Sequence, residues 1–481
     1  MANRPNILWI CTDSQRYDTL GVYGNPHVHT PNLDRLAGQG VLFNHCTVQN
    51  PVCAPSRGAM LTGRYPRTTR LRQNGQSIPE DEVLITRLMS DAGYVCGLSG
   101  KLHISACHPV ACRGTERRIN DGYDEFHWSH HPTPSWPTAE YNHWLRERGA
   151  EWTRTPHPDS QRVFLGMSAE LHQTTWCARK AIDFMEANAA FDSPWLFSVN
   201  PFDPHDSFDP PEEYLRPYVD RLDEIPLPNY HEGELDSKPL FQQIDHRGAY
   251  NNPQNYPYPE MNERDHRLVR AAYWAMCDLI DAQVGRMLAV LEKTGQLANT
   301  IVVFTSDHGE LLGDHGIYLK GSYFYEPSIR VPLIVSWPGH IASDVRSDAL
   351  VELVDLAPTL LDLVGLPHPP GMQARSLRSL LVGQADVHTH REDVYSESYY
   401  SLRDHKDPRP YATMVRTRRH KLVAMHGMEP GELYDLQVDP DETRNLWNEP
   451  EYRAVKLEMF QRLCDRMAWT VDPLPAREAP W

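Results

Sequence analysis

Four short apolar segments, each followed by polar residues, constrain the fold of this chain more than any other sequence feature. They span residues 6–11, 94–98, 195–199 and 300–304. Continuous apolar strands of this kind are typical of a mostly parallel sheet that is covered on both faces. Helical patterns lie between them, over residues 82–92 before Gly93 and over residues 265–294 before Gly295. This alternation predicts an α/β fold.

The polar residues behind these segments are candidates for a single site. In open α/β sheets, ligands bind outside the carboxyl ends of the strands, so the four loops are expected to meet at one crevice. A single Asp or His after a strand is often only a cap or turn residue. Four such loops at one sheet edge favour a site instead. The residues concerned are Asp13, Lys101, His103, His205, Asp307 and His308.

The length of 481 residues exceeds the usual limit for one simple core, so we expect a large domain with a smaller companion. Proline-rich residues 366–371 are the best boundary candidate, because proline clusters interrupt regular structure. We therefore predict a catalytic α/β domain over residues 1–370 and an α+β subdomain over residues 371–481. In the subdomain, two strand-like segments and a closing helix are expected, at residues 411–415, 421–425 and 451–468.

Two polar stretches lack a clear periodic pattern. Residues 201–262 are rich in Pro, Asp, Glu and Tyr, and we predict that they are loops around the cleft. Residues 128–152 carry several aromatic side chains, which either form a platform for a substrate or pack onto their own domain.

Composition excludes several classes of function. The apolar fraction is 40%, and no apolar run approaches the ~20 residues that span a bilayer, so no membrane segment is expected. The first apolar stretch is too short for a signal-peptide core, which favours the cytoplasm. A formal charge of -17 argues against non-specific nucleic-acid binding, and the acidic surface is compatible with a homo-oligomer such as a dimer.

The nine cysteines show no disulfide framework. Cys107 and Cys112 lack the second half of a zinc-type pair, and most of the cysteines are expected to be reduced and inert.

One cysteine lies in a motif with a known chemistry. Cys53-Ala54-Pro55-Ser56-Arg57 is the pattern at which sulfatases convert cysteine into formylglycine. A buried cysteine before a helix is the plainer interpretation, because free Cys behaves as a small hydrophobe. Pro55 and Ser56 also predict a helix start, whose free N–H groups and positive dipole favour an anion.

Further motifs follow in order along nearly the whole chain. They are Pro5-Asn6-Ile7, Thr30-Pro31-Asn32-Leu33-Asp34, Gly63-Arg64-Tyr65, Gly100-Lys101-Leu102-His103, Pro204-His205, Ser306-Asp307-His308-Gly309, Lys320, Glu432-Leu433-Tyr434-Asp435-Leu436, Asp439-Pro440 and Glu442. With these motifs the chain resembles the type I sulfatases of the alkaline phosphatase superfamily. The resemblance implies an alkaline-phosphatase-like large, mostly parallel sheet sandwiched by helices, with a smaller antiparallel sheet plus helix.

The resemblance also implies an activity, the hydrolysis of sulfate monoesters. A hydrated formylglycine at Cys53 would attack sulfur and pass through a covalent sulfo-enzyme intermediate. The implied roles are as follows: Arg57 orients the formylglycine, Lys101 and Lys320 clamp sulfate oxygens, His103 assists release of sulfate, His205 protonates the leaving oxygen, and Asn74 contacts the substrate. The implied partners are a small anionic sulfate ester and a formylglycine-generating maturation enzyme.

A divalent metal ion is implied at Asp13, Cys53, Asp307 and His308. Carboxylate oxygens suit Ca2+, which is the first expectation. The family often has paired aspartates where this chain has Asp13-Ser14, and commonly an asparagine at the place of His308. An imidazole ligand also admits Mn2+, Zn2+ or Fe2+, of which Mn2+ is the second expectation. Ser14 is expected to participate only weakly or indirectly.

Two other functions are compatible with the sequence. The Asp307-His308 pair and Asn74 also resemble phosphonate monoester hydrolases and phosphodiesterases that share the formylglycine, whereas Lys101-Leu102-His103 matches the sulfatases. A non-catalytic binding protein would result if Cys53 remained a thiol. The sequence does not distinguish an aryl, sugar or alkyl leaving alcohol.

Overall fold

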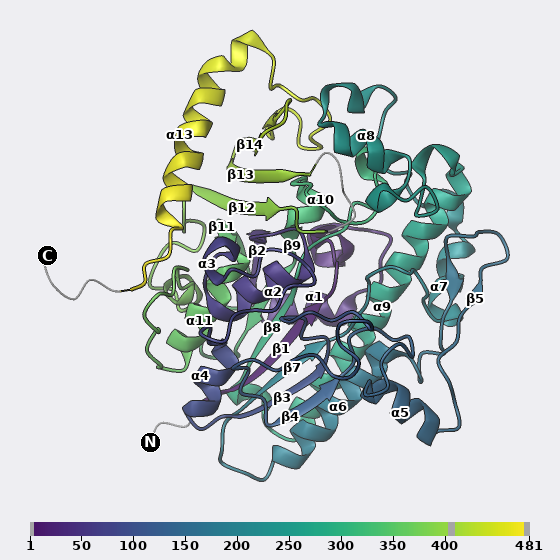
Figure 1. Cartoon of the computed structure of the whole chain (residues 1–481). Helices are drawn as coiled ribbons and strands as arrows, with labels where there is room; N and C mark the ends of the chain where they lie inside the picture. Colours follow the sequence, from purple (N-terminus) through teal and green to yellow (C-terminus); the bar gives the residue numbers. More distant parts are fainter. Residues whose placement is uncertain (1–3, 403–408, 476–481) are drawn as a thin grey trace, which may run out of the picture.

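A computed structural model describes residues 4–402 and 409–475. Its centre is a large sheet with the strand order β11-β2-β10-β8-β1-β7-β3-β4, and β9 pairs with β2 (Figure 1). The strands are β1 (Asn6–Thr12), β2 (Gly40–Thr47), β3 (Val95–Gly100), β4 (Glu125–Trp128), β7 (Trp195–Asn200), β8 (Thr300–Ser306), β9 (Arg330–Val331), β10 (Leu333–Ser336) and β11 (Val345–Glu352).

The four strands predicted from apolar segments are neighbours in the middle of this sheet. They are β8, β1, β7 and β3, and each runs parallel to the next. Their carboxyl ends therefore lie at the same edge, which confirms the prediction. β9 and β10 are the exceptions to the parallel arrangement, because β10 runs antiparallel to both β2 and β8 and β9 runs antiparallel to β2. The sheet is thus mostly parallel.

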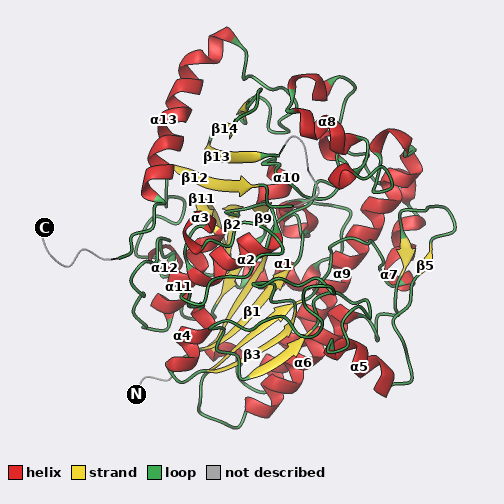
Figure 2. Ribbon diagram, viewed as in Figure 1, coloured by secondary structure: helices red, strands yellow, loops and turns green. Residues whose placement is uncertain are grey.

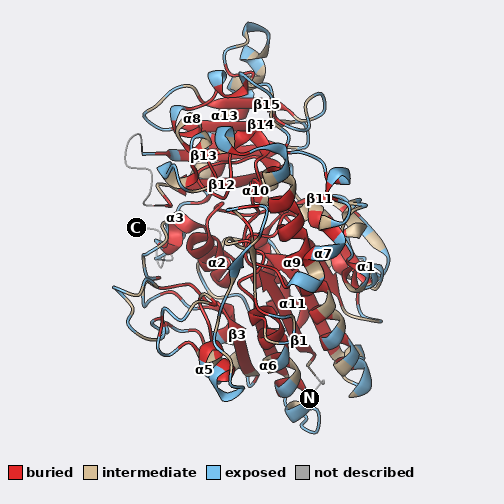
Figure 3. Cartoon of the chain, turned by 90° about the vertical axis from the view of Figure 1, so that its right-hand side faces the viewer, coloured by how far each residue is buried: buried red, intermediate tan, exposed pale blue. Residues whose placement is uncertain are grey.

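Both faces of the large sheet are covered by helices. Along β1, Ile7 and Trp9 enter one core cluster, while Leu8 and Ile10 enter another, as the two-residue period of a strand requires. The first cluster includes apolar residues of α2 (Cys53–Thr62), α4 (Ile85–Asp91) and α11 (Leu356–Leu363). The second includes residues of α1 (Pro31–Gly38), α5 (Glu140–Glu147), α6 (Gln173–Asn188) and α9 (Glu263–Lys293). Figure 3 shows the strands buried between these layers.

A four-stranded antiparallel sheet forms the C-terminal part (Figure 2). It contains β12 (Asp393–Tyr399), β13 (Tyr411–Thr417), β14 (His420–Met425) and β15 (Glu432–Asp435), and α13 (Arg453–Trp469) packs on it. One face, with Leu422, contacts α13, whereas the other face, with Met414 and Val423, joins the same core cluster as the large sheet. The predicted antiparallel sheet and closing helix are confirmed. The division at residue 370 stays a prediction, because the two parts share this cluster.

Two details differ from the sequence expectations. The stretch 201–262, expected as loops, contains α7 (Glu212–Val219) and α8 (Leu240–His246), each too short to give a clear periodic pattern. The helix expected from residue 82 begins at Ile85, and the Glu82 carboxylate pairs with Arg64 at 3.1 Å instead. The remaining elements are α3 (Pro66–Thr69), β5 (Thr155–Pro156), β6 (Phe164–Leu165), α10 (Glu326–Ile329) and α12 (Arg378–Leu381).

The aromatic stretch around residues 128–152 packs inward. Trp136, Tyr141 and Trp144 are all buried, which agrees with the packing interpretation rather than an open platform. All nine cysteines lie in the described part of the chain and are free thiols. Among the helices that the structure describes, none combines the length and the apolar character that crossing a bilayer needs.

Candidate active site

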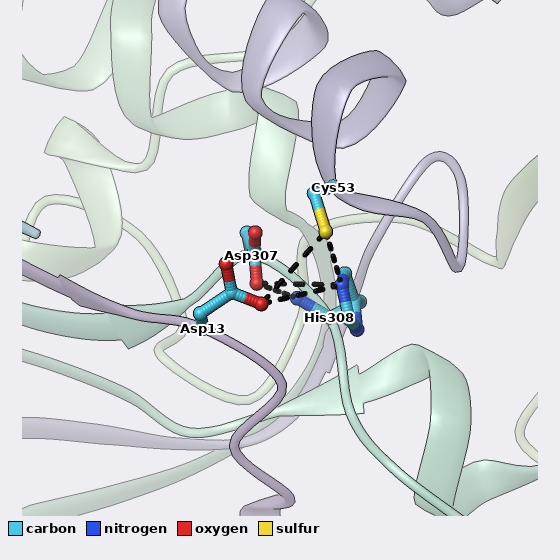
Figure 4. A group of neighbouring side chains, drawn as sticks. All are labelled: Asp13, Cys53, Asp307 and His308. Atoms are coloured by element: carbon cyan, nitrogen blue, oxygen red, sulfur yellow. Dashed lines mark hydrogen bonds and ion pairs between the residues drawn. The ribbon is translucent and has the colours of Figure 1, made fainter. Parts of the chain in front are cut away.

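The carboxyl ends of the parallel strands meet the start of α2. Asp13 follows β1, Asp307 and His308 follow β8, and Cys53 is the first residue of α2 (Figure 4). The four side chains are buried, and one ligand atom from each lies within 4.8 Å of the others. The Cys53 sulfur is 3.1 Å from His308 Nε2 and 3.8 Å from Asp13 Oδ1. The structure therefore brings together the four residues that were expected to hold a metal ion.

Helix α2 both carries Cys53 and fixes the carboxylates. The Ser56 hydroxyl donates to the Asp307 carbonyl oxygen at 2.5 Å. The buried Arg57 guanidinium donates to Asp307 Oδ2 at 2.8 Å and to Asp13 Oδ2 at 3.4 Å. Arg57 is therefore an internal ion-pair partner that orients the two carboxylates. Charge-assisted hydrogen bonds of this kind offset the cost of burying the guanidinium charge.

Two buried lysines lie against the Cys53 sulfur. The ammonium nitrogens of Lys101 and Lys320 are 3.6 Å and 3.2 Å from it, and Lys101 also contacts Asp13 Oδ2 at 2.5 Å. Burial raises the pKa of the Cys53 thiol, but the charges of Lys101, Lys320 and His308 outweigh it and hold that pKa well below its usual value. The pocket thus favours an anion at this position.

Gly100 lets the chain turn from β3 into Lys101. Its φ of +99° lies in the left-handed region, and a Cβ there would collide with the carbonyl oxygen of Asn200 on β7. The glycine of the Gly-Lys-Leu-His motif therefore has a steric role that places the lysine.

His103 is held through its backbone. Its N–H donates to both carboxyl oxygens of Glu116, at 2.8 Å and 3.0 Å, and its φ is 58°. Burial, reinforced by the charge of Lys101, lowers the pKa of His103 to about 4. The ring is therefore neutral near pH 7 and able to accept a proton.

His205 has the opposite protonation state. Its Nδ1 lies 2.6 Å from the carbonyl oxygen and 2.9 Å from Oδ1 of Asp206. Burial and Lys320 lower the pKa of His205, but the carboxylates of Asp206 and Asp13 outweigh them and raise it to about 10. The ring is therefore protonated near pH 7 and able to donate a proton.

Asn74 also lies at the start of α2. Its side-chain oxygen accepts the N–H of Ala54, the residue after Cys53, at 3.0 Å. The residues predicted for the site are thus grouped around Cys53. Asp314 is not part of this group. Its carboxylate forms ion pairs with Arg16 at 2.7 Å and with Arg270 at 3.0 Å.

Comparison with known proteins agrees with this geometry. The model of the sulfatase family matches residues 5–366. The chain belongs to the sulfatase family. A second model, described as N-sulphoglucosamine sulphohydrolase, C-terminal, matches residues 313–468. The chain is accordingly a sulfuric ester hydrolase, and its fold is alkaline-phosphatase-like.

Individual relatives match over almost the full length of this sulfatase. An arylsulfatase from Clostridium perfringens is 29% identical over 475 residues, covering 94% of this chain and 92% of that protein. An N-acetylglucosamine-6-O-sulfatase from Bacteroides thetaiotaomicron is 26% identical over 510 residues, covering 96% and 86%. The solved structure of a phosphonate monoester hydrolase from Silicibacter pomeroyi has a TM-score of 0.84 and 26% identity, covering 98% of this chain and 96% of that one.

The metal-ligand group of this sulfatase fits a divalent cation. Two carboxylates and an imidazole converge at a site where the side chains of Asp13, Asp307 and His308 are fully buried. Carboxylate oxygens and imidazole nitrogen are ligands for Ca2+ and Mn2+, respectively. Ser14 supports the group indirectly, because its N–H donates to Asp307 Oδ1 at 3.1 Å and its hydroxyl to Asp13 Oδ1 at 3.0 Å.

Sequence reasoning missed several polar neighbours of the sulfatase site. Glu116 lies in an irregular segment and accepts the backbone N–H of His103. No sequence pattern indicates such a contact. Asp206 directly follows His205, so the adjacency could have indicated it. Glu310 is buried, and burial together with Asp206 raises its pKa to about 7. One apolar neighbour was also missed. The Phe202 ring packs against the His205 ring, with 4.6 Å between the two centroids.

Proposed function

We propose that this sulfatase hydrolyses sulfate monoesters with a formylglycine, formed from Cys53, as its nucleophile. The observation that carries this proposal is the position of the Cys53 sulfur, which lies at the start of a buried helix between the ammonium groups of Lys101 and Lys320. A helix N-terminus and two fixed cations favour a tetrahedral anion. The nucleophile and the clamp for a sulfate group thus share one pocket.

The two histidines of the site supply and accept protons in this reaction. The hydrated aldehyde carries two hydroxyls on one carbon. One hydroxyl releases its proton to solvent, its oxygen attacks the ester sulfur, the bond from sulfur to the alcohol oxygen breaks, and the alcohol leaves with the proton of His205. This gives the covalent sulfo-enzyme intermediate. The second hydroxyl then loses its proton to His103, the carbon–oxygen bond to sulfate breaks, and sulfate leaves as the aldehyde re-forms and is hydrated again.

The protonation states of the two histidines support these roles. A pKa of about 4 leaves His103 free to accept a proton, and a pKa of about 10 keeps His205 ready to donate one. General acid–base catalysis by such positioned groups contributes about 10²–10⁴-fold to a rate.

Asp13, Asp307, His308 and the modified Cys53 would hold one divalent cation, with Ca2+ as the first expectation and Mn2+ as the second. When bound, such a cation lowers the pKa of a neighbouring hydroxyl. Arg57 and Ser14 keep both carboxylates oriented toward it. A maturation enzyme for Cys53, a homo-oligomeric state and a cytoplasmic location stay predictions.

Phosphonate monoester hydrolysis is a second candidate activity. The structural likeness to the hydrolase from Silicibacter pomeroyi favours it, as does the position of Asn74 beside Cys53. The same clamp suits both tetrahedral groups. The placement of Lys101 and His103 at the Cys53 pocket supports the sulfate ester as the better substrate.

Turnover of an aryl sulfate and an aryl phosphonate monoester, compared side by side, tests the proposal. The enzyme should be fully converted at Cys53, as measured by peptide mass spectrometry, and a Cys53→Ala preparation controls for contaminating hydrolases. We expect the higher kcat/KM for the sulfate ester. A higher value for the phosphonate would reverse the assignment, and finding Cys53 as an unconverted thiol in protein without turnover would support a binding protein.

A further inference from the structure

A second group of potential metal ligands lies behind His103. Cys107, Glu116 and His130 bring one thiol, one carboxylate and one imidazole together, with a ligand atom of each within 4.8 Å of the others. Cys107 and Glu116 belong to the segment between β3 and β4, and His130 follows β4. The group shares no residue with the cluster at Cys53.

The imidazole of this group has an unsatisfied nitrogen. His130 is only 9% exposed, and its Nδ1 has no hydrogen-bond partner among the described residues. A buried polar atom without a partner is destabilising, so such atoms call for an explanation such as a bound ion. Cys112 offers a second thiol nearby: it acts on the pKa of Cys107, lies outside the group of three, and now donates to the Gly114 carbonyl oxygen at 3.0 Å, which it would have to leave to bind an ion.

We propose that Cys107, Glu116 and His130 bind a Zn2+ ion, with Cys112 as the fourth protein ligand. Thiolate, imidazole and carboxylate are the ligands that Zn2+ prefers, and a site with four protein ligands is structural rather than catalytic. Tetrahedral zinc holds its ligand atoms about 3.3–3.8 Å apart, so the 4.8 Å group needs to contract by only about 1 Å. Both thiols would lose their protons on binding.

This explains why the sequence alone pointed away from zinc. Cys107 and Cys112 are separated by four residues, a spacing found in zinc sites, but no second cysteine pair follows them. In the structure, the remaining two ligands of the proposed zinc site are Glu116 and His130, which belong to two different segments.

The zinc would fix the surroundings of His103. Both oxygens of Glu116 accept the His103 N–H, and the His130 ring packs edge-on against the His103 ring, with 4.5 Å between centroids. A cross-link between Glu116 and His130 would therefore hold His103 from two sides. Ligand residues that also position a neighbouring group couple metal binding to local order.

Cobalt substitution tests the site directly. Full-length Cys53→Ala protein, in which no thiol remains in the cluster at Asp13, is titrated with Co2+ under reducing conditions. We expect one equivalent of Co2+ to give the intense near-ultraviolet band of a thiolate–cobalt bond. Cys107→Ser in the same background should abolish most of this band and Cys112→Ser should halve it, whereas Cys464→Ser, at an exposed cysteine, should leave it unchanged. A band that survives Cys107→Ser would overturn the proposal.

The unsubstituted enzyme provides a test that does not depend on folding of a variant. Crystals grown with Zn2+ should show an anomalous peak at the zinc edge among Cys107, Glu116 and His130. A map with no peak there, or a disulfide between Cys107 and Cys112 in the reduced, zinc-treated protein, would contradict the site.

Discussion

The ammonium nitrogen of Lys320 lies 3.2 Å from the sulfur of Cys53, although the two residues are 267 positions apart in the sequence. Lys101 approaches the same sulfur at 3.6 Å. The two cations come from different loops and both are buried, so their charges act on Cys53 in surroundings of low polarity.

Lys101→Ala and Lys320→Ala should each lower the turnover of sulfate esters by ~10²–10³-fold, because each removes one preorganised charge. Steady-state kinetics on the fully converted enzyme measures this. Lys293→Ala is the matched control, since its side chain is 76% exposed and, within residues 4–402 and 409–475, pairs with Glu186 alone. If Lys101→Ala kept wild-type turnover, the proposed role of Lys101 in holding the sulfate group would be wrong.

Cys53→Ala should abolish turnover while the protein stays folded, because the sulfur contacts Lys101, Lys320 and His308 rather than the apolar clusters that support the sheet. The expected loss exceeds about 10³-fold. Peptide mass spectrometry of the active wild-type enzyme should find formylglycine at this position. An active preparation that contains only unmodified cysteine would rule out the proposed nucleophile.

His205→Ala should slow esters of poorly acidic alcohols more than aryl esters with acidic leaving groups, because an activated phenolate needs little protonation. The measurement is a plot of turnover against the pKa of the leaving group. We expect a steeper slope in the variant. Equal losses across the series would remove His205 from the acid role.

The pH profile provides an independent check on the same residue. His205 is protonated below its pKa of about 10, so the acid form is lost as the pH rises through that value. Asp206→Asn removes a carboxylate that raises this pKa, and the alkaline limb of kcat for a poor leaving group should therefore move to lower pH. An unchanged limb would show that another group titrates there.

Asp307→Ala should lose the divalent cation at the Cys53 cluster, and His308→Asn should keep it but favour Ca2+ over Mn2+, because an amide oxygen replaces an imidazole nitrogen. Anomalous scattering distinguishes this cation from any zinc at Cys107. A cation that stays bound without Asp307, or an active enzyme free of metal, would contradict the proposed ligand set.

Lys421→Ala should destabilise the fold strongly. Its fully buried ammonium pairs with Glu326 at 2.8 Å and with Glu442 at 2.7 Å. Glu326 keeps Arg416 at 3.1 Å, so removing Lys421 leaves the buried Glu442 carboxylate without its cation. Breaking a buried pair of this kind costs about 3–5 kcal/mol. Denaturant unfolding measures the change, with exposed Lys293→Ala as the control. A loss below 1 kcal/mol would place Lys421 with ordinary surface lysines.

The sequence predicted the central strands well and carried no prediction for β10. Buried parallel strands are continuous apolar runs, as in β1 and β8, and these stand out without any tertiary information. β10 has only four residues, and its antiparallel direction depends on the path of the chain from β9. The direction of β10 therefore cannot be predicted from the apolar character or the length of its segment.

At the site, residues that act with their side chains were easier to predict than residues that act on the backbone. Cys53, Asp13 and Asp307 lie in recognisable motifs after strands or at a helix start. Glu116 binds an N–H of His103 thirteen positions away, and such a contact depends on how the intervening loop folds. Lys320 falls between these cases, since it was placed by its order in the chain and by the residues Tyr325-Glu326-Pro327 that follow it.

The shared core has a consequence for when the enzyme can be matured. Cys53 is 1% exposed, and the cluster that encloses α2 includes Met414, Val423 and Tyr434 from the small sheet. The last of these strands ends at Asp435, so a ribosome must release most of the chain before the core can close. An enzyme that converts Cys53, as proposed above, would therefore have to reach the thiol during translation or on an unfolded chain. Once folding is complete, the thiol is buried and leaves such an enzyme no second opportunity.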